Sequence, residues 1–225
     1  MDPIEIAFSN IYRRNRWGDP ESRSGEGSSL RVTEGMRSEL PKLFAHFGIQ
    51  SIFDAPCGDL NWMKEVLRAC DIRYVGADIV GELVDKLQST YGTARVRFAR
   101  LDITRAAFPP AQLWLCRDSL FHLPFREIFA AFDRYIESGI PWVLTTSSVV
   151  PPDHVNKDIR IGDFRPLDLF REPFNFPQGV HWRIEDPVGA NMRELCLWSR
   201  EQLLMVLPNH KPVRQAVADR GASGP

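Results

Sequence analysis

The sequence predicts an α/β protein built on a doubly wound, mostly parallel seven-stranded sheet with helices on both faces, a Rossmann-like arrangement. Two observations predict this fold class: short apolar runs of strand character alternate with amphipathic stretches, and aspartates stand at the ends of three successive runs. With 225 residues, of which 44% are hydrophobic, the chain is long enough for one domain with a full core.

The predicted elements follow in order along the chain. The first five strands are expected at residues 51–55, 74–78, 95–102, 113–116 and 142–146, with helices at 60–70, 81–91 and 124–137 between them. Two further strands are expected at 181–185 and 194–198, with a helix at 200–207 beside or after them. An earlier helix is expected to begin near Ser28 or Ser29, because a serine side chain can accept a hydrogen bond from the first helical turn.

The chain is expected to have three parts: an N-terminal arm at 1–29, one domain at 30–210 with an insertion on the substrate side at about 149–180, and a flexible tail at 211–225. The glycines and serines of RRNRWGDPESRSGEGSSL are typical of a flexible linker. Trp17 and the arginines in the same stretch favour a folded arm that closes over a bound ligand as a lid. Both interpretations stay open from the sequence.

Composition limits the partners. The chain has 28 Lys and Arg against 29 Asp and Glu, a net charge of −1, which gives no electrostatic reason to expect nucleic acid. No apolar run approaches the roughly 18 residues of a membrane span. The start MDPIEIAF has no features of a secretion signal, so reduced thiols in the cytoplasm are expected. The four cysteines lack the paired short spacing of a zinc site, and the composition predicts no oligomeric state.

The stretch IFDAPCGDLNW, residues 52–62, breaks an apolar run with an acid and then a glycine. Ligands of doubly wound sheets sit beyond the carboxyl ends of the strands, where Asp54 and Gly58 are expected. A glycine lets the backbone approach a ligand closely, and amides at the next helix start can receive polar groups. Leu60 and Asn61 stand where further glycines of G-x-G-x-x-G would fall, which argues against a dinucleotide site.

Two more acids end the next two predicted strands. Asp78, in YVGAD, follows Asp54 by 78 − 54 = 24 residues and can accept hydrogen bonds from both ribose hydroxyls of a nucleoside. Asp102, in RFARLDI, is placed to reach an adenine amino group. Each acid alone can be a helix N-cap. Three of them at successive strand ends favour a nucleoside site.

These residues resemble the class I S-adenosylmethionine-dependent methyltransferases. DAPCG looks like their first motif, GAD like the ribose-binding acid, and LD like the adenine-side acid. Over about residues 10–198 the chain is similar to a narrower, mostly uncharacterised group with the motifs DAPCGDxNWM and CRDxLxHL and with stretches like RWGDPESRSGEGSS, GDFRPLDL and PFNFP. Some relatives appear alongside genes for surface polysaccharides, so the resemblance implies glycan methylation.

The resemblance implies S-adenosyl-L-methionine as cofactor and S-adenosyl-L-homocysteine as product. Trp17 or Trp62 would face the sulfonium, whose positive charge suits an aromatic surface. The residues expected to bind the cofactor are Trp17, Asp54, Ala55, Pro56, Cys57, Gly58, Asn61, Trp62, Asp78, Ile79, Asp102, Ile103 and Arg117.

Asp118 and His122, in LWLCRDSLFHL, are the catalytic candidates, because residues after the fourth strand of this fold lie beside the transferable methyl group. A hydroxyl acceptor must lose a proton, which neutral His122 or Asp118 can take. The alternatives are that His122 packs against the cofactor without moving protons and that Asp118 positions the methionine part or caps a helix. Asp118 with Asp158 or Asp163 is a weak basis for a Mg²⁺ site, so no metal is expected.

The connection after the fifth strand spans some thirty residues, and such long loops are typically functional or disordered. Its aromatics favour order, and Phe164 or Phe176 can stack on an acceptor ring. The alternative is a surface excursion with ordinary turn residues. The residues expected to bind the acceptor are Asn156, Asp158, Asp163, Arg165, Asn175 and Phe176.

The function expected from these features is O-methylation of a small-molecule or glycan hydroxyl. One alternative is N-methylation of a small amine, peptide or protein, although the chain lacks the N/D-P-P-Y/F pattern common in enzymes that methylate base or glutamine amides. The other is a cofactor-binding module that has lost catalysis and works through a partner.

Overall fold

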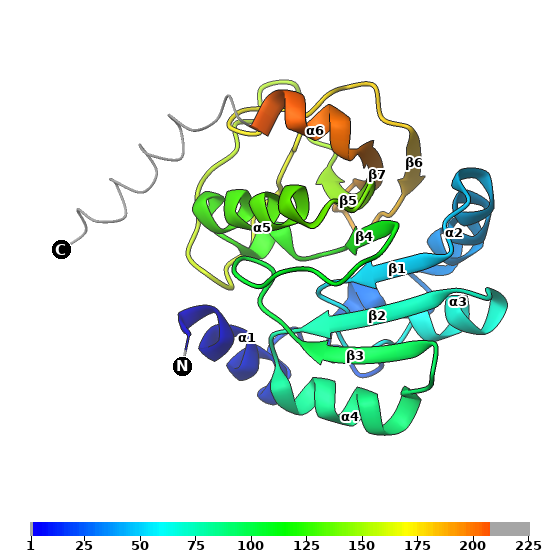
Figure 1. The fold of residues 1–225 in the computed structure, drawn as a ribbon. Helices are drawn as coiled ribbons and strands as arrows, with labels where there is room; N and C mark the ends of the chain where they lie inside the picture. Colours follow the sequence, from blue (N-terminus) through cyan, green and yellow to red (C-terminus); the bar gives the residue numbers. More distant parts are fainter. Residues whose placement is uncertain (1, 208–225) are drawn as a thin grey trace.

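Seven strands form one sheet in the order β3-β2-β1-β4-β5-β7-β6 in the computed structural model, which describes residues 2–207 (Figure 1). The first five strands run parallel, whereas β7 is antiparallel to both β5 and β6. This confirms the predicted fold class, and the predicted tail at 211–225 lies outside the described residues. The strands are β1 (Ser51–Asp54), β2 (Arg73–Asp78), β3 (Val96–Arg100), β4 (Leu113–Cys116), β5 (Trp142–Ser148), β6 (Trp182–Glu185) and β7 (Arg193–Ser199).

Helices lie on both sides of the sheet (Figure 1). The predicted helix at 81–91 and strand at 113–116 have the observed bounds, and the other strands and helices predicted from residue 51 onward begin and end within three residues of those observed. The helices are α1 (Pro3–Arg13), α2 (Glu34–Phe47), α3 (Met63–Ala69), α4 (Gly81–Tyr91), α5 (Phe125–Ser138) and α6 (Arg200–Val206), with short 3₁₀ turns η1 (Glu26–Ser28) and η2 (Leu120–His122).

The helix predicted to begin near Ser28 or Ser29 begins instead at Glu34, after Thr33 as N-cap. Ser28 ends the turn η1, and the hydroxyl of Ser29 accepts from the amide of Val32 at 3.3 Å. The serine side chain therefore closes a local turn, which competes with helix capping for the same group.

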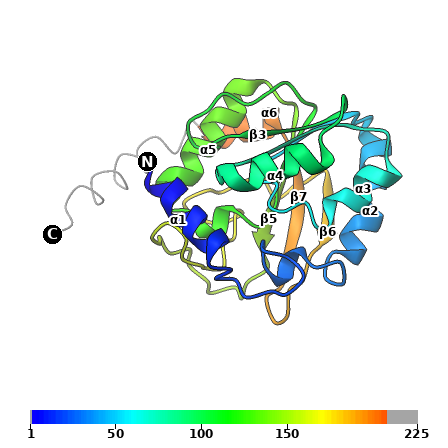
Figure 2. The same ribbon diagram turned by 90° about the horizontal axis from the view of Figure 1, so that it is seen from below.

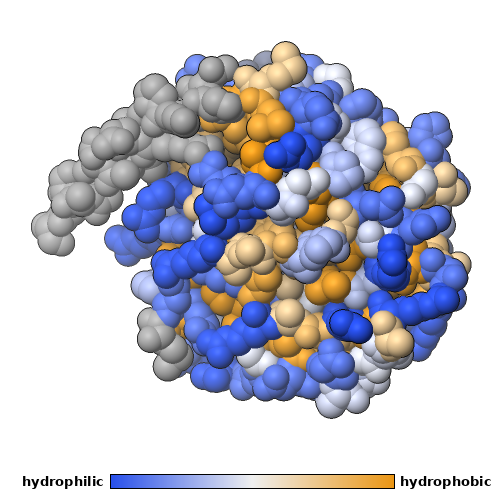
Figure 3. Space-filling view, in the orientation of Figure 1, coloured by the Kyte–Doolittle hydropathy of each residue, from blue (hydrophilic) through white to orange (hydrophobic). Residues whose placement is uncertain are grey.

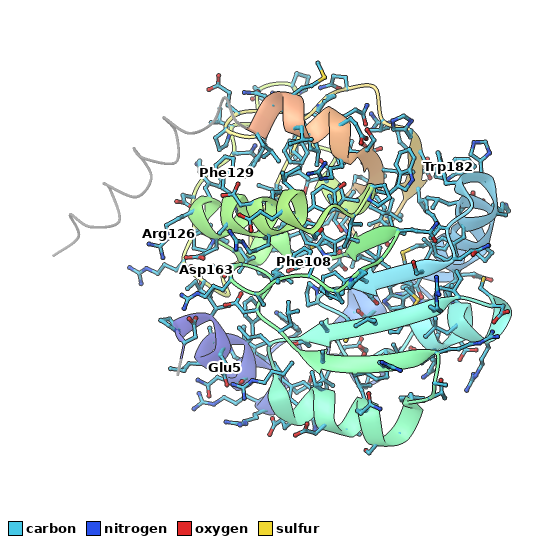
Figure 4. The ribbon with its side chains drawn as sticks, in the orientation of Figure 1. Glu5, Phe108, Arg126, Phe129, Asp163 and Trp182 are labelled. Atoms are coloured by element: carbon cyan, nitrogen blue, oxygen red, sulfur yellow. The ribbon has the colours of Figure 1, made fainter. Side chains whose placement is uncertain are left out.

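The two faces of the sheet carry separate apolar cores because successive strand residues point to opposite faces. Ile52 packs on the side of α2, α3 and α4, and its neighbour Phe53 on the side of α5 and α6. On that second side Phe108 stacks at a tilt against Phe53 and Trp114, at 4.8 and 5.1 Å between ring centroids, and Figure 4 labels it between α5 and the sheet. The apolar residues of α5 recur at helical spacing and supply the largest block of this core: Phe125, Ile128, Phe129, Phe132 and Tyr135.

The N-terminal segment, for which the sequence left a flexible linker and a folded arm open, is folded. Its helix α1 begins at Pro3 after Asp2, whose carboxylate accepts from the amide of Ile4 at 2.9 Å, a normal start for a helix. In Figure 1 α1 lies off the sheet, beside the ends toward which β2 and β3 point, and Figure 2 shows it outside the sheet from below.

Asp59, directly after Gly58 in the loop that follows β1, holds the rest of the arm. Its carboxylate accepts from the hydroxyl of Ser22 at 2.9 and 3.0 Å and from the amide of Arg23 at 2.8 Å. Its own amide donates to the hydroxyl of Ser24 at 3.0 Å. We refer below to residues 2–29 as the arm, and these bonds fix it across the carboxyl end of β1.

On the face shown in Figure 3, hydrophobic residues reach the surface among hydrophilic ones. Within residues 2–207, no helix combines the length and the apolar character that crossing a membrane requires.

Candidate active site

Two adjoining cavities lie at the carboxyl edge of the parallel strands. The inner cavity, with an empty volume of about 980 Å³ including its mouth, is lined by residues that follow β1 to β4 and by the arm. The outer cavity, about 1190 Å³ on the same measure, lies between the arm, the loop around 162–164 and the turn between β6 and β7. The two cavities share Trp17, Ser24, Asp118 and His122.

Most residues predicted to bind the cofactor line the inner cavity: Trp17, Asp54, Pro56, Cys57, Gly58, Trp62, Asp78, Ile79, Asp102, Ile103 and Arg117. Two do not. Ala55 lies beneath the cavity, where its carbonyl accepts from the indole of Trp114 at 3.0 Å. Asn61 donates to Glu21 at 2.6 Å and to the carbonyl of Ser28 at 3.0 Å, so it secures the arm.

Asp54 is 2% exposed at the end of β1, and the hydroxyl of Tyr74 donates to its carboxylate at 2.6 Å. Burial raises the pKa of Asp54 to about 7, because desolvation disfavours the charged form more than the Tyr74 bond favours it. Burial therefore favours the protonated form of this carboxyl.

The free energy of unfolding of the ligand-free protein is expected to fall as the pH rises from about 5 to 6.5. The folded pKa of Asp54 lies above the unfolded value of about 3.9. The stability that protonated Asp54 contributes is thus fully present below about pH 3.9 and is lost as the pH rises through about 7, the pKa of Asp54 in the folded protein. One such group changes the free energy by at most about 1.4 kcal/mol per pH unit, so we expect Asp54 to account for about 1–2 kcal/mol of this fall, while Asp78 acts in the same direction.

Urea unfolding at several pH values measures this slope. Asp54→Asn, which keeps an acceptor for Tyr74 and cannot titrate, should have a smaller slope than the parent. An equal slope in both proteins would assign the pH dependence to other groups.

Asp78 receives two backbone amides, from Val80 at 3.0 Å and from Gly58 at 3.2 Å, and thereby joins the loops after β1 and β2. Gly58 has φ +54°, and a Cβ placed on it would lie 2.3 Å from the hydroxyl oxygen of Ser24. The glycine therefore makes room for the arm. Burial raises the pKa of Asp78 to about 6, although its amide bonds oppose the shift.

Asp102 lies two residues beyond β3, and the predicted end of that strand was too late. Its Oδ1 accepts from the amide of Thr104 at 2.8 Å and from its hydroxyl at 2.7 Å. Its Oδ2 is buried without a hydrogen-bond partner among the described residues, and the nearest cation, Arg105, is 3.7 Å away. This oxygen is free to accept from a ligand that fills the cavity.

A chain of four charges, three of them buried and Asp118 partly exposed, lies beside the two cavities. Asp186 accepts from Nε and Nη2 of Arg117 at 3.0 and 2.8 Å, and Nη2 also donates to the carbonyl of Gly27 in the arm at 2.7 Å. Asp118 accepts from Arg193 at 2.9 Å and lies 3.1 Å from Arg117. Two arginines and two aspartates neutralise one another, a requirement for charges this deeply buried.

Asp118 is fixed by its neighbours. Its carboxylate contacts Arg117 and Arg193, and its backbone, at φ +54°, is held by a bond from its amide to the hydroxyl of Thr146 at 3.0 Å. This placement agrees with a positioning role, one of the alternatives that the sequence left open for Asp118.

His122 lines both cavities, and its Nδ1 lies 2.8 Å from the carbonyl oxygen of Asp163. Because a carbonyl oxygen only accepts, Nδ1 carries the proton of the neutral ring and Nε2 keeps a free lone pair. Burial lowers the pKa of His122 from its ordinary 6.5, so the ring is neutral at physiological pH. Trp17 stacks on it with ring centroids 5.3 Å apart.

The residues predicted to bind the acceptor separate into two groups. Asp163 and the neighbouring Phe164 line the outer cavity. Figure 4 shows Asp163 on the side of the molecule where α1 lies, and a Cβ placed on Gly162 would lie 3.1 Å from Ile11 of that helix. This part of the long loop therefore faces the arm.

The other predicted acceptor residues line neither cavity. Asn156 donates to the carbonyls of Asp168 and Glu172, each at 2.8 Å, and Asp158 accepts from the amide of Phe125 at 2.8 Å. These placements give no support to an acceptor role. The same holds for Asn175, an exposed turn residue with φ +49°, for Phe176, which is 2% exposed in the core, and for Arg165, which is 6% exposed over the ring of Phe125.

The sequence interpretation missed several residues of the site. Ile4, Phe8 and Tyr12 line the inner cavity from α1, and their four-residue spacing after Asp2 and Pro3 was a readable helix signal. Asp186 and Arg193 carried no local signal, because their partners are 69 and 75 residues away.

Comparison with known proteins gives matches among solved structures alone. No family model matches the chain. No curated protein matches it either. One similar structure is magnesium protoporphyrin IX methyltransferase from Synechocystis PCC 6803 with bound S-adenosylmethionine, at 13% identity and a TM-score of 0.58, with 89% of this chain and 98% of that one covered. Another is 1,6-didemethyltoxoflavin-N1-methyltransferase from Burkholderia thailandensis with 1,6-didemethyltoxoflavin and S-adenosylhomocysteine, at 17% identity and a TM-score of 0.58, with 87% of this chain and 86% of that one covered. A third is human N-acetylserotonin methyltransferase with S-adenosylmethionine, at 15% identity and a TM-score of 0.55, with 88% of this chain and 60% of that one covered.

At these identities the likeness establishes the architecture of the chain. Strand order, the antiparallel β7 and the cavity at the carboxyl edge all belong to that architecture. The chain therefore shares its fold with these three methyltransferases.

Proposed function

We propose that the protein is an S-adenosylmethionine-dependent methyltransferase that acts on the hydroxyl oxygen of a small molecule or glycan. The observation that carries the proposal is the alignment of Asp54, Asp78 and Asp102 along one cavity in a fold shared with methyltransferases. When bound, S-adenosylmethionine supplies an electrophilic methyl group on a sulfonium.

The carboxylates fit such a cofactor. Asp102 Oδ2 is a buried acceptor without a partner among the described residues, suited to an adenine amino group. Asp78 is already oriented by two amides and retains lone pairs for ribose hydroxyls. Asp54 offers a carboxylate whose ionisation a cationic group nearby would favour.

The arm serves as the cofactor lid in this proposal. Ile4, Phe8, Tyr12 and Trp17 line the inner cavity from the arm, so a bound cofactor would be covered by them. Trp17 lines both cavities and is the aromatic ring we assign to the sulfonium, since the ring of Trp62 already faces Arg117 at 5.6 Å.

The choice of oxygen as acceptor atom rests on His122. A hydroxyl must lose its proton on methylation, and His122 provides a neutral imidazole whose Nε2 can take it. The described cysteines are all free thiols, which agrees with a cytoplasmic location.

Asp78→Ala is expected to weaken binding of S-adenosylhomocysteine by about 1.5–3 kcal/mol, the value of lost charge-assisted hydrogen bonds. Calorimetric titration measures this, with circular dichroism to confirm that the variant is folded. Asp85→Ala, at an exposed position on the neighbouring α4, is the matched control and should bind as the parent does.

Unchanged affinity in a folded Asp78→Ala variant would defeat the ribose assignment. If the parent binds NADH or ATP and has no affinity for S-adenosylhomocysteine, the methyltransferase proposal itself fails.

A further inference from the structure

Resting on the proposed function, we propose that the methyl acceptor is an aromatic hydroxyl, a phenol-class compound, bound in the outer cavity with its ring against Phe164 and its oxygen at His122. The proposal goes beyond the choice of oxygen, because it selects a flat aryl ring over a sugar.

The outer cavity has an aromatic wall centred on His122. The ring centroid of His122 lies 5.3 Å from that of Trp17 and 6.0 Å from that of Phe164, and Phe164 packs edge-on against Phe121 at 5.3 Å. Trp17 is 38% exposed and Phe164 51% exposed, although rings of this size usually bury most of their surface. Phe164 is the more exposed of these two rings, and it offers a surface beside the candidate base against which an aryl group can pack.

Five charged residues line the outer cavity, Arg16, Glu26, Asp118, Asp163 and Arg193, and two of them compensate one another. Asp118 and Arg193 line the outer cavity and bind one another at 2.9 Å, within the neutral chain that also contains Arg117 and Asp186. These groups can orient an acceptor through remaining donor and acceptor positions, and they present no net charge to it. The rings that contact His122 are those of Trp17, Phe121 and Phe164, so ring contact is available beside this residue.

The chemistry of His122 points to the same class. Burial lowers the pKa of its imidazole, which makes it a weak base. A phenol loses its proton with a pKa of about 10, as the tyrosine side chain does. An aliphatic or sugar hydroxyl is a weaker acid than a phenol, because no aromatic ring delocalises the charge of its anion. A weak base therefore matches the phenol better, because each unit of pKa difference makes proton transfer tenfold less favourable.

The proposed transfer balances without another reactant. The acceptor oxygen forms a bond to the methyl carbon while the bond from that carbon to sulfur breaks, and the sulfur keeps the electron pair as a neutral thioether. The hydroxyl proton passes to Nε2 of His122 and then to solvent when the product leaves. The role of His122 is to hold the hydroxyl in line and to accept its proton.

Binding of two named probes to the protein saturated with S-adenosylhomocysteine tests the proposal: 1-naphthol, a phenol, and methyl α-D-glucopyranoside, a sugar. Ligand-observed NMR titration should detect binding of 1-naphthol and weaker or no binding of the glucoside. Phe164→Ala should weaken 1-naphthol binding about threefold to tenfold, the size of one aromatic contact. Phe164→Tyr keeps an aromatic ring at this position and should bind 1-naphthol as the parent does. Val155→Ala is the control, because Val155 is 71% exposed and lines neither cavity, and it should leave 1-naphthol binding unchanged.

Three outcomes would overturn the proposal: no binding of 1-naphthol, equal binding by the parent and Phe164→Ala, or tighter and Phe164-dependent binding of the glucoside. In each of these cases normal affinity for S-adenosylhomocysteine would leave the proposed function standing with another acceptor. Loss of S-adenosylhomocysteine binding by the parent protein would instead defeat both proposals.

Discussion

His122→Ala is expected to lower turnover by about 10²–10⁴-fold, the usual contribution of a general base, while affinity for S-adenosylhomocysteine barely changes. The physical reason is the fixed tautomer: the carbonyl of Asp163 holds the proton on Nδ1 and leaves Nε2 to accept one from the acceptor. Labelled-methyl transfer under saturating cofactor measures the rate, and titration measures the affinity.

The rate of the parent enzyme should rise with pH and level off above the pKa of His122, because only the neutral ring accepts a proton. Burial places that pKa below the ordinary 6.5, so the rise should occur on the acid side of this value. His46→Ala, at an exposed residue in the last turn of α2, is the matched control and should change neither rate nor pH profile.

An effect of His122→Ala on cofactor affinity in place of turnover would contradict the prediction. If His122→Ala weakens S-adenosylhomocysteine binding and leaves saturated turnover intact, the residue belongs to the cofactor pocket and the base assignment is wrong. A rate independent of pH in the parent would favour an acceptor that is already a neutral amine, or a different base.

The strand-end acids could be predicted because parallel strands determine their position. Apolar runs placed Asp54 and Asp78 at the ends of β1 and β2, and neighbouring parallel strands bring such ends to one edge of the sheet. The same reasoning placed Asp102 at the end of the third strand, although β3 ends two residues before it. All three line one cavity.

The long loop after β5 could not be interpreted the same way. A loop that packs against the core must satisfy its own backbone groups, and its polar side chains are used for this purpose. Asn156 binds two carbonyls of the loop, and Asp158 binds the first amide of α5. A sequence contains the same asparagine or aspartate whether it binds an acceptor or a backbone group, so polarity alone did not distinguish the two.

Contacts between segments far apart in the chain could not be predicted from the sequence either. Arg117 follows β4 and Asp186 follows β6, at positions whose proximity depends on the order β4-β5-β7-β6 in the sheet. Each residue read alone is an ordinary charged side chain. The buried pair exists because the fold carries both into a region from which water is excluded.

Asp186→Ala is expected to lower the free energy of unfolding by about 3–5 kcal/mol, the largest stability loss we anticipate for a single substitution in this site. The side chain of Asp186 is 0% exposed, and that of Arg117 is 3% exposed. Without Asp186, Arg117 and Arg193 would share the single carboxylate of Asp118, which leaves one uncompensated positive charge in a buried region. Urea unfolding of the parent and the variant measures the loss.

Glu82→Ala is the matched control, because it also removes one acid from an ion pair, with Arg13, but at the surface, where both side chains are at least 43% exposed. Water replaces such a partner, so a loss below about 1 kcal/mol is expected.

A second variant separates charge imbalance from the loss of packing. Arg117→Met combined with Asp186→Ala removes one charge of each sign and leaves Asp118 paired with Arg193 at 2.9 Å. The double variant should therefore be more stable than Asp186→Ala alone, since replacing a whole buried ion pair by apolar groups costs little. Should the double variant be less stable than Asp186→Ala, lost packing and hydrogen bonds would account for the effect. In that case the bond from Arg117 to the carbonyl of Gly27, by which this network holds the arm over the inner cavity, would be the contact to test next.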